Sequence, residues 1–288
     1  MSKRSIPWLS LLAVLALLPV LFAPALAAPA EESGEPLGDV PALTASNMGN
    51  GSLTDDSPLG LAAADAAAAS CGADLALLCG GDLAGNLLPG PVTWEKLRFA
   101  FAADPALALC TVSPAQLREL LEFCLSRMTV DEHDLSIDRE ASAFAAFPQV
   151  AGFTVKYDVS APIGSRVTEL TALDGTDLLS PENAGAAYLL VSTEPLLSGS
   201  YGPVPDLPRQ PAGMTVCQAL ADFIAAGRMT DYSDADRVRS IGSTDSSLVR
   251  ELGLNSVLLP VCIIAALALG AFYRAKSRRV QPELPTAD

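Results

Sequence analysis

A glycine-rich loop is the first part of this sequence whose residue types suit chemistry. The loop from Cys79 to Pro91 reads CGGDLAGNLLPGP and follows the apolar run Ala73–Leu78. Backbone N–H groups of such loops can bind a phosphate where a strand leads toward a helix. The loop has neither the lysine nor the glycine spacing of a P-loop. On its own it is therefore a weak indication of an anion site.

A lone histidine is the second feature that could take part in catalysis or metal binding. His133 lies in the polar segment 128–146, between Glu132 and Asp134. These side chains could bind a cation weakly, although a solvated acidic loop is the more common role of such a run. A Ser-His-Asp or Cys-His site needs a base that a third group orients. One histidine in an acidic loop does not meet that need, so we expect no catalytic residue and no metal site.

Capping patterns and hydrophobic periodicity predict the elements that must hold these residues. Capping hydroxyls predict helices that begin after Ser57, Thr93, Ser113 and Thr215, the third of them reaching Arg127. Short apolar or alternating runs predict strands over 73–78, 106–112, 153–158, 166–173 and 186–192. The turn Pro162-Ile163-Gly164 predicts a hairpin between the third and fourth of these strands. This mixture indicates one α+β (mixed α/β) domain over 55–242.

Two segments are predicted to be irregular. Residues 28–54 are rich in Pro, Gly, Ser and acidic residues without periodicity, which predicts a flexible linker. The polar segment 128–146 predicts an insertion or a mobile loop. We therefore expect the folded part to begin near Asp55.

The two ends of the chain predict export and anchoring. A basic start, an apolar run and the small-residue site Ala25-Leu26-Ala27 are typical of a signal peptide over 1–27, and Pro19 and Pro24 argue against a transmembrane helix there. The uncharged run over 254–273 predicts a transmembrane helix after a juxtamembrane linker at 243–253. Basic residues directly after it mark the tail 274–288 as cytoplasmic. We thus expect a single-pass cell-membrane protein with an extracytoplasmic domain and the lipid bilayer as a partner.

The net charge bears on nucleic-acid binding, and the cysteine count bears on disulfide formation. The formal net charge is −15, and such an acidic surface repels nucleic acid, so we expect no nucleic-acid partner. The odd number of cysteines before the predicted span leaves at least one unpaired. Their apolar settings predict buried thiols, with at most one disulfide, the pairing of which stays open among Cys71, Cys79, Cys110, Cys124 and Cys217.

Several motifs together resemble one known family. The stretches DSPLGLAAADA (56–66), ADLALLCGGDLAGNLLPGPVT (73–93) and VSPAQLRELLEFCL (112–125) are similar to segments of the C-terminal domain of the 5'-nucleotidases. The stretch FPQVAGFTVKYDVSAPIGSRV (147–167) matches that family's pattern nearly position by position. In two-domain surface or periplasmic enzymes, this domain holds the nucleoside of the substrate. The resemblance implies the same fold for the predicted domain.

The resemblance also implies where a substrate pocket would lie. Cys79 and Ala84 occupy positions at which the family has an Asn and an Arg that hold substrate. The acidic residue of the family's G-G-D-G turn has no counterpart, because this segment reads SGSYG. The degenerate pocket is predicted to comprise Cys79, Gly80, Gly81, Asp82, Ala84, Phe101, Ala103, Leu196 and Tyr201.

Two aromatic rings of the family enclose the base of the substrate. The first corresponds to Ala103, unless Phe99 or Phe101 takes its place in a shifted register, and the second corresponds to Leu196. Stacking contributes roughly 1–3 kcal/mol per base, so the loss of both rings would weaken nucleoside binding by orders of magnitude. These two substitutions therefore argue against a nucleoside or nucleotide ligand.

The family's catalytic half has no counterpart among these motifs. It is an N-terminal domain that binds two metal ions, which activate water and hold the phosphate in line. The resemblance therefore implies a chain without cofactor that is not catalytic alone. We expect an accessory or binding module linked to nucleotide catabolism. The alternatives are a surface interaction or structural protein that binds no nucleotide, and a nucleotide hydrolase acting with a metallophosphatase from another chain.

Overall fold

The computed structural model describes residues 34–45, 51–131 and 136–241. From Glu35 onward the described residues belong to one unit. The predicted signal peptide, the predicted span at 254–273 and His133 lie outside the described residues. Within the described ranges, no helix combines the length and the apolar character that crossing a membrane requires.

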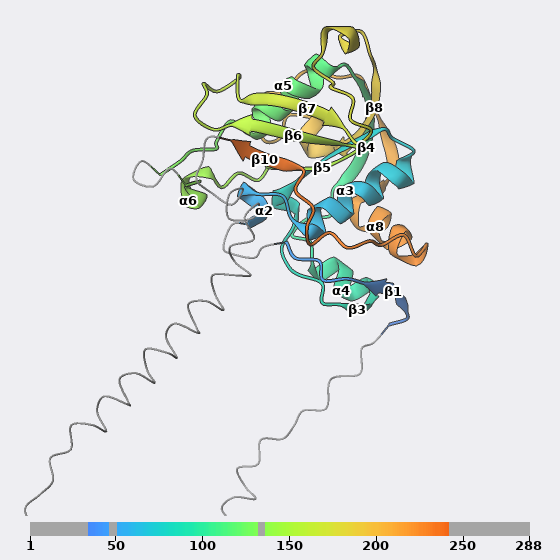
Figure 1. Ribbon diagram of the computed structural model, residues 1–288. Coiled ribbons are helices and arrows are strands. Elements are labelled where there is room, and N and C mark those ends of the chain that lie inside the picture. The colour runs from blue at the N-terminus through green and yellow to red at the C-terminus, as the bar shows by residue number, and fades with distance from the viewer. Residues whose placement is uncertain (1–33, 46–50, 132–135, 242–288) are drawn as a thin grey trace, which may run out of the picture. The chain divides into compact units, whose positions relative to one another are not determined.

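A five-stranded mixed sheet forms the centre of the unit (Figure 1). Its strands, in spatial order, are β5 (Pro148–Ala151), β2 (Leu75–Cys79), β8 (Tyr188–Thr193), β4 (Ala106–Val112) and β9 (Arg209–Thr215). The pair of β2 and β8 is parallel, and the other three pairs are antiparallel. The predicted mixed α/β class is confirmed.

Each face of this sheet has its own core, because side chains alternate along a strand. Leu75 and Leu77 of β2 join a cluster with α5 (Pro114–Cys124), whereas Ala76 and Leu78 join a cluster with α3 (Pro58–Cys71) and α8 (Val216–Ala225). Figure 1 accordingly shows α3 beside α8, with α5 in another part of the fold. The strand β2 is therefore buried on both sides, and the glycine loop leaves from its end.

A second sheet covers the face that carries α5. It has three strands in the order β10 (Val238–Ile241), β6 (Phe153–Asp158) and β7 (Val167–Ala172). The predicted hairpin of β6 and β7 is confirmed, and Gly164 in its turn has a φ of 88°, which glycine adopts without strain. The last strand, β10, runs parallel to β6, a pairing that no local pattern indicates.

The linker predicted over 28–54 is wrong in its described part. Residues 36–40 form β1 (Pro36–Val40), which pairs with β3 (Gly90–Thr93), and residues 51–54 form α2 (Gly51–Thr54). The backbones of Leu43 and Leu87 exchange hydrogen bonds of 3.0 and 2.8 Å, and the Leu43 side chain is fully buried. Buried apolar side chains such as Leu43 thus hold this segment in the fold despite its many Gly and Pro residues.

The segment 128–146, predicted as an insertion or mobile loop, is also ordered where it is described. Val130 and Ile137 form an isolated bridge, and α6 (Arg139–Ser142) follows. The buried Ser142 hydroxyl accepts a hydrogen bond from Thr129 N (2.9 Å) and donates one to Thr129 O (3.1 Å). A buried hydroxyl that satisfies both backbone groups fixes the segment, and composition does not reveal such a contact.

All four predicted helix starts are confirmed. Each capping side chain accepts a hydrogen bond from the backbone N–H three residues on, at the starts of α3, α4 (Trp94–Phe99), α5 and α8. The helix α5 ends at Cys124 rather than at Arg127. The five described cysteines are all free thiols, and all except Cys71 are buried, as predicted.

Candidate functional site

The glycine loop begins where β2 ends and packs tightly against its surroundings. Gly80 and Gly81 lie in a 3-10 turn, η1 (Gly80–Asp82). A Cβ atom on Gly80 would collide with the carbonyl oxygen of Ser52, and one on Gly81 would lie 2.6 Å from the Cβ of Ala145. Both glycines are therefore required by close approach of neighbouring chain segments rather than by a ligand.

Several amide groups of this loop are already used inside the protein. Gly80 N donates to Phe147 O (2.8 Å), and Gly81 N donates to Ala145 O (2.8 Å). Ala84 N and the following amide both donate to Ala100 O, at 2.9 and 3.1 Å. A phosphate cradle needs several unpaired amides. The loop does not offer these amides to an anion.

A buried carboxyl group occupies the centre of the loop. The Asp82 side chain is 5% exposed, and the Tyr201 hydroxyl donates a long hydrogen bond of 3.5 Å to its Oδ1. Its Oδ2 is buried and has no hydrogen-bond partner among the described residues. Burial raises the pKa of Asp82 to about 6, and the nearby Asp104 adds to that rise, whereas the Tyr201 hydrogen bond opposes it.

Cys79 extends this cluster into the core. Its side chain is 1% exposed, and its Sγ lies 3.8 Å from Thr193 Oγ1 at the end of β8. Burial raises the pKa of the Cys79 thiol well above its usual value. A thiol that stays protonated in an apolar setting is a poor nucleophile. Sequence reasoning did not identify Thr193, because only the β2–β8 pairing brings it to Cys79.

The two positions implied to carry aromatic rings do not form a stacking site. Leu196, in α7 (Glu194–Leu197), is fully buried. Ala103 is exposed, Phe101 is buried at 8% exposure, and the ring of Phe99 is 76% exposed. Ala103 N donates to Asp82 O (3.4 Å), which holds this segment in place beside the glycine loop. The structure thus joins Cys79, Asp82 and Tyr201 in one cluster, with Ala84 and Ala103 at the surface and Leu196 in the core.

A buried glutamine explains the stretch that matches the family pattern best. Gln149, on β5, is fully buried, and its Oε1 accepts a hydrogen bond from Ser57 N (2.9 Å). Its Nε2 donates to the carbonyl oxygens of Ser52 (3.3 Å) and Asp55 (3.0 Å). These bonds tie α2 and the start of α3 to the sheet. The stretch that contains Gln149 therefore has a structural role, because it holds in place Ser52, which packs against Gly80 of the glycine loop.

An ionic network fastens the last described strand to the first long helix. The guanidinium of Arg237 donates to both carboxylate oxygens of Asp65 on α3, at 2.6 and 2.9 Å. The Tyr232 hydroxyl donates to the same carboxylate at 3.0 Å. Asp56 Oδ2 accepts hydrogen bonds from the backbone N–H of Arg237 (2.6 Å) and Val238 (3.2 Å), and burial raises the pKa of Asp56 to about 7. Local sequence patterns did not reveal this network, because its members are far apart in the chain.

A metal centre is not evident in the part of the chain that the structure describes. Within it, no group of three or more His, Cys, Asp or Glu side chains is placed to hold a metal ion. The side chains gathered at the loop are one carboxyl, one thiol and two hydroxyls, on Asp82, Cys79, Thr193 and Tyr201.

Comparisons with known proteins agree on the fold. The sequence model for the 5'-nucleotidase C-terminal domain matches residues 38–202. Among solved structures, a 5'-nucleotidase precursor from Thermus thermophilus is similar, with a TM-score of 0.60, 19% identity, and coverage of 82% of this chain and 44% of that one. An NAD nucleotidase from Haemophilus influenzae gives a TM-score of 0.56 at 15% identity, covering 73% of this chain and 38% of that one. No curated protein sequence matches significantly. The chain spans less than half the length of these structural relatives.

Proposed function

Because the chain belongs to the 5'-nucleotidase C-terminal domain family, we propose that it is a membrane-anchored, extracytoplasmic module of that family that does not hydrolyse nucleotides by itself. One observation supports the non-catalytic part of this proposal. The side chains at the implied substrate positions Cys79 and Leu196 are buried at 1% and 0% exposure and serve the core. Side chains buried this deeply present no surface to a ligand in this structure.

Charge at the loop supports the same proposal. Asp82 places a buried carboxyl group in the loop, and the amides of Gly80, Gly81 and Ala84 are paired with carbonyl oxygens. A carboxylate repels a phosphate, and burial strengthens that repulsion because the local dielectric is low. Any nucleotide breakdown linked to this chain would then rely on a metallophosphatase supplied by another chain.

Hydrolysis by the purified protein is the direct test. The full chain in detergent micelles is incubated with AMP and either Mn²⁺ or Zn²⁺, and phosphate release is followed. We expect no release above the rate without protein. Turnover at an enzyme-like rate, on the order of 1 per second or faster, would refute the non-catalytic role.

The anchor is tested separately. A chain that ends after residue 253 lacks the predicted transmembrane helix and should leave the membrane fraction, whereas the full chain should resist extraction at alkaline pH. N-terminal sequencing of the mature protein should begin at Ala28 if the predicted signal peptide is removed after Ala27. A truncated chain that still resists extraction would contradict the proposed anchor.

A second function is favoured by the same burial of Cys79 and Leu196. The module would then be a surface interaction or structural protein that binds no nucleotide at all. Calorimetric titration with adenosine and with AMP separates the two roles. Saturable binding in the micromolar range would support an accessory role in nucleotide catabolism. Absence of heat at millimolar ligand would support the interaction role.

A further inference from the structure

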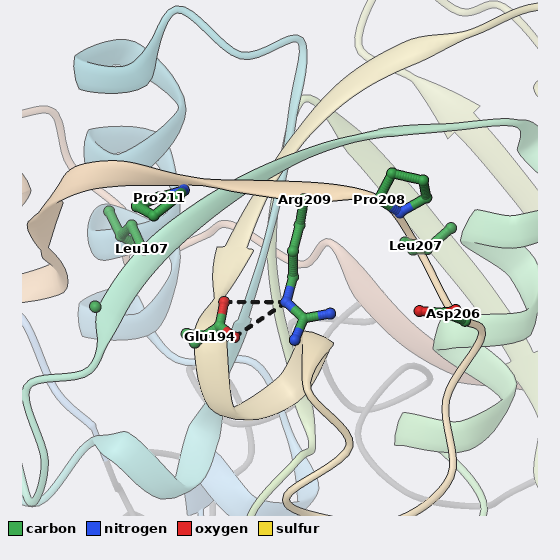
Figure 2. A pocket seen from close by; sticks show the side chains of 8 residues that line it. Leu107, Glu194, Asp206, Leu207, Pro208, Arg209 and Pro211 are labelled. Carbon is green, nitrogen blue, oxygen red and sulfur yellow. Dashed lines mark hydrogen bonds and ion pairs between the residues drawn. The ribbon is translucent and has the colours of Figure 1, made fainter.

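A pocket of about 460 Å³ lies at the edge of the five-stranded sheet and shares no lining residue with the Asp82 cluster. It is lined by β4, by the first residue of α7, and by β9 with the segment before it (Figure 2). Its lining residues are Ala106, Leu107, Glu194, Asp206, Leu207, Pro208, Arg209 and Pro211. A volume of this size with mainly apolar walls and a few polar groups is typical of a small-molecule site.

The guanidinium of Arg209 is only partly used. Its Nε donates to both carboxylate oxygens of Glu194, at 3.0 and 3.1 Å. Its two terminal nitrogens have no hydrogen-bond partner among the described residues. In Figure 2 the side chain extends from β9 down to Glu194, and one terminal nitrogen is directed toward the side on which Asp206 lies. The ion pair with Glu194 thus fixes the guanidinium and leaves its outer edge open.

A carboxylate faces this open edge across the pocket. Asp206 lines the same pocket, and its side chain forms no hydrogen bond or ion pair with any described residue. Figure 2 shows Leu207 and Pro208 on the Asp206 side of Arg209, and Leu107 and Pro211 on the other side. The pocket therefore combines an open guanidinium edge, an unpaired carboxylate and an apolar wall.

We propose that this pocket binds a free α-amino acid with an apolar side chain. The α-carboxylate would accept two hydrogen bonds from the terminal nitrogens of Arg209, a geometry that guanidinium groups favour. The α-ammonium group would lie between the carboxylates of Asp206 and Glu194. The side chain would cover the exposed apolar lining residues Ala106, Pro208 and Pro211.

The arrangement of charges selects against simpler ligands. A plain carboxylate would meet Arg209 but would be repelled by the two acidic side chains, and a plain amine would leave the open edge of Arg209 without an acceptor. A zwitterion satisfies both sets of groups at once. The proposal does not depend on the non-catalytic role or on the membrane anchor, because every group in it belongs to the pocket.

Binding of L-leucine to the full chain in detergent micelles, measured by equilibrium dialysis with labelled ligand, tests this proposal. We expect saturable binding, and affinity weaker by about tenfold or more for 4-methylpentanoate, which lacks the ammonium group, and for 3-methylbutylamine, which lacks the carboxylate. Absence of saturable leucine binding, or equal binding of all three compounds, would overturn the proposal.

Variants locate the site. Arg209→Gln and Asp206→Asn should each weaken leucine binding by about tenfold or more, since each removes a charged partner. Asp206→Asn is the cleaner of the two, because that side chain is exposed and forms no hydrogen bond or ion pair with a described residue, whereas Arg209 pairs with Glu194. Lys156→Gln, which breaks an exposed ion pair of 2.8 Å with Glu169 elsewhere on the surface, is the matched control and should bind leucine normally. Unchanged binding by Asp206→Asn would also overturn the proposal.

Discussion

Arg237 and Asp65 form a two-bond ion pair that joins the end of the described chain to the first long helix. The two hydrogen bonds are 2.6 and 2.9 Å long, and the side chains are only 16% and 24% exposed. Arg237 also donates to Val150 O at 3.0 Å, so one guanidinium connects α3, β5 and the start of β10. This ion pair therefore holds three elements of the fold together and is not an isolated surface contact.

Replacement of Arg237 by Met should lower the free energy of unfolding by about 2–4 kcal/mol, because it leaves the Asp65 carboxylate without its partner in a mostly buried setting. Urea unfolding followed by circular dichroism measures the change. Lys156→Met, which breaks the ion pair with 43% and 55% exposed side chains, should cost less than about 1 kcal/mol. Equal losses for the two variants would contradict the structural role of Arg237.

Asp56 should make the protein less stable as the pH rises. Burial raises the pKa of Asp56 to about 7, whereas the ordinary value is 3.8, so the folded state keeps a proton that the unfolded state releases. The free energy of unfolding therefore falls with rising pH between about 4 and 7. Asp56→Asn retains an acceptor for the two N–H groups and should flatten this slope.

Urea unfolding at several pH values between 4 and 8 provides the measurement. Asp82, with a pKa raised to about 6, contributes in the same direction, so part of the slope should remain in Asp56→Asn. Asp158→Asn is the control. Asp158 is exposed and its pKa is lowered, mainly by hydrogen bonds from Ser160, so its contribution to stability changes with pH in the opposite direction to that of Asp56. An unchanged slope in Asp56→Asn would rule out Asp56 as its origin.

Tyr201→Phe should raise the pKa of Asp82 further. The hydroxyl of Tyr201 donates the 3.5 Å hydrogen bond to Asp82 Oδ1 and favours its ionised form, so its removal favours the protonated form. NMR titration of carboxyl-labelled aspartate follows this group directly. Tyr188→Phe serves as the control and should leave the Asp82 titration unchanged. A lower pKa in Tyr201→Phe would contradict a stabilising hydrogen bond between the two side chains.

The two positions of the missing rings should respond differently to phenylalanine. Leu196→Phe should destabilise the protein by about 1–3 kcal/mol, because a larger side chain at a fully buried position forces its neighbours to move. Ala103→Phe, at an exposed site, should change stability by less than about 0.5 kcal/mol. Thermal unfolding of both variants measures the difference. If Leu196→Phe were well tolerated, the fold would have room for an aromatic ring at the position that corresponds to the family's second ring.

Local signals predicted much of the fold. The capping side chains Ser57 and Ser113 mark the starts of α3 and α5, because a cap acts within one turn of its own helix. The alternation in FTVKYD and the turn around Gly164 likewise identified the hairpin of β6 and β7. Interactions between residues close in the sequence are sufficient to predict these elements.

The remaining elements depend on distant partners. The strand β9 reads RQPAGMT, in which a proline and a glycine hide the strand pattern, and only pairing with β4 defines it. The segment 34–45 is interrupted by Gly and Pro and shows no periodicity, and its fold rests on anchors such as Leu43. For the same reason, the resemblance located the Cys79 and Asp82 loop, but the contacts to Thr193 and Tyr201 became visible only in three dimensions.

The position of β10 also sets an order of events during synthesis. The ribosome releases residues 35–236 before Arg237, so the nascent domain holds both sheets except for this closing strand. Until Arg237 emerges, Asp65 lacks its ion-pair partner and Asp56 lacks the two N–H donors that approach it from Arg237 and Val238. A chain cut before Arg237 would therefore contain the residues of nearly all elements while lacking the contacts that Arg237 and Val238 make with Asp65 and Asp56.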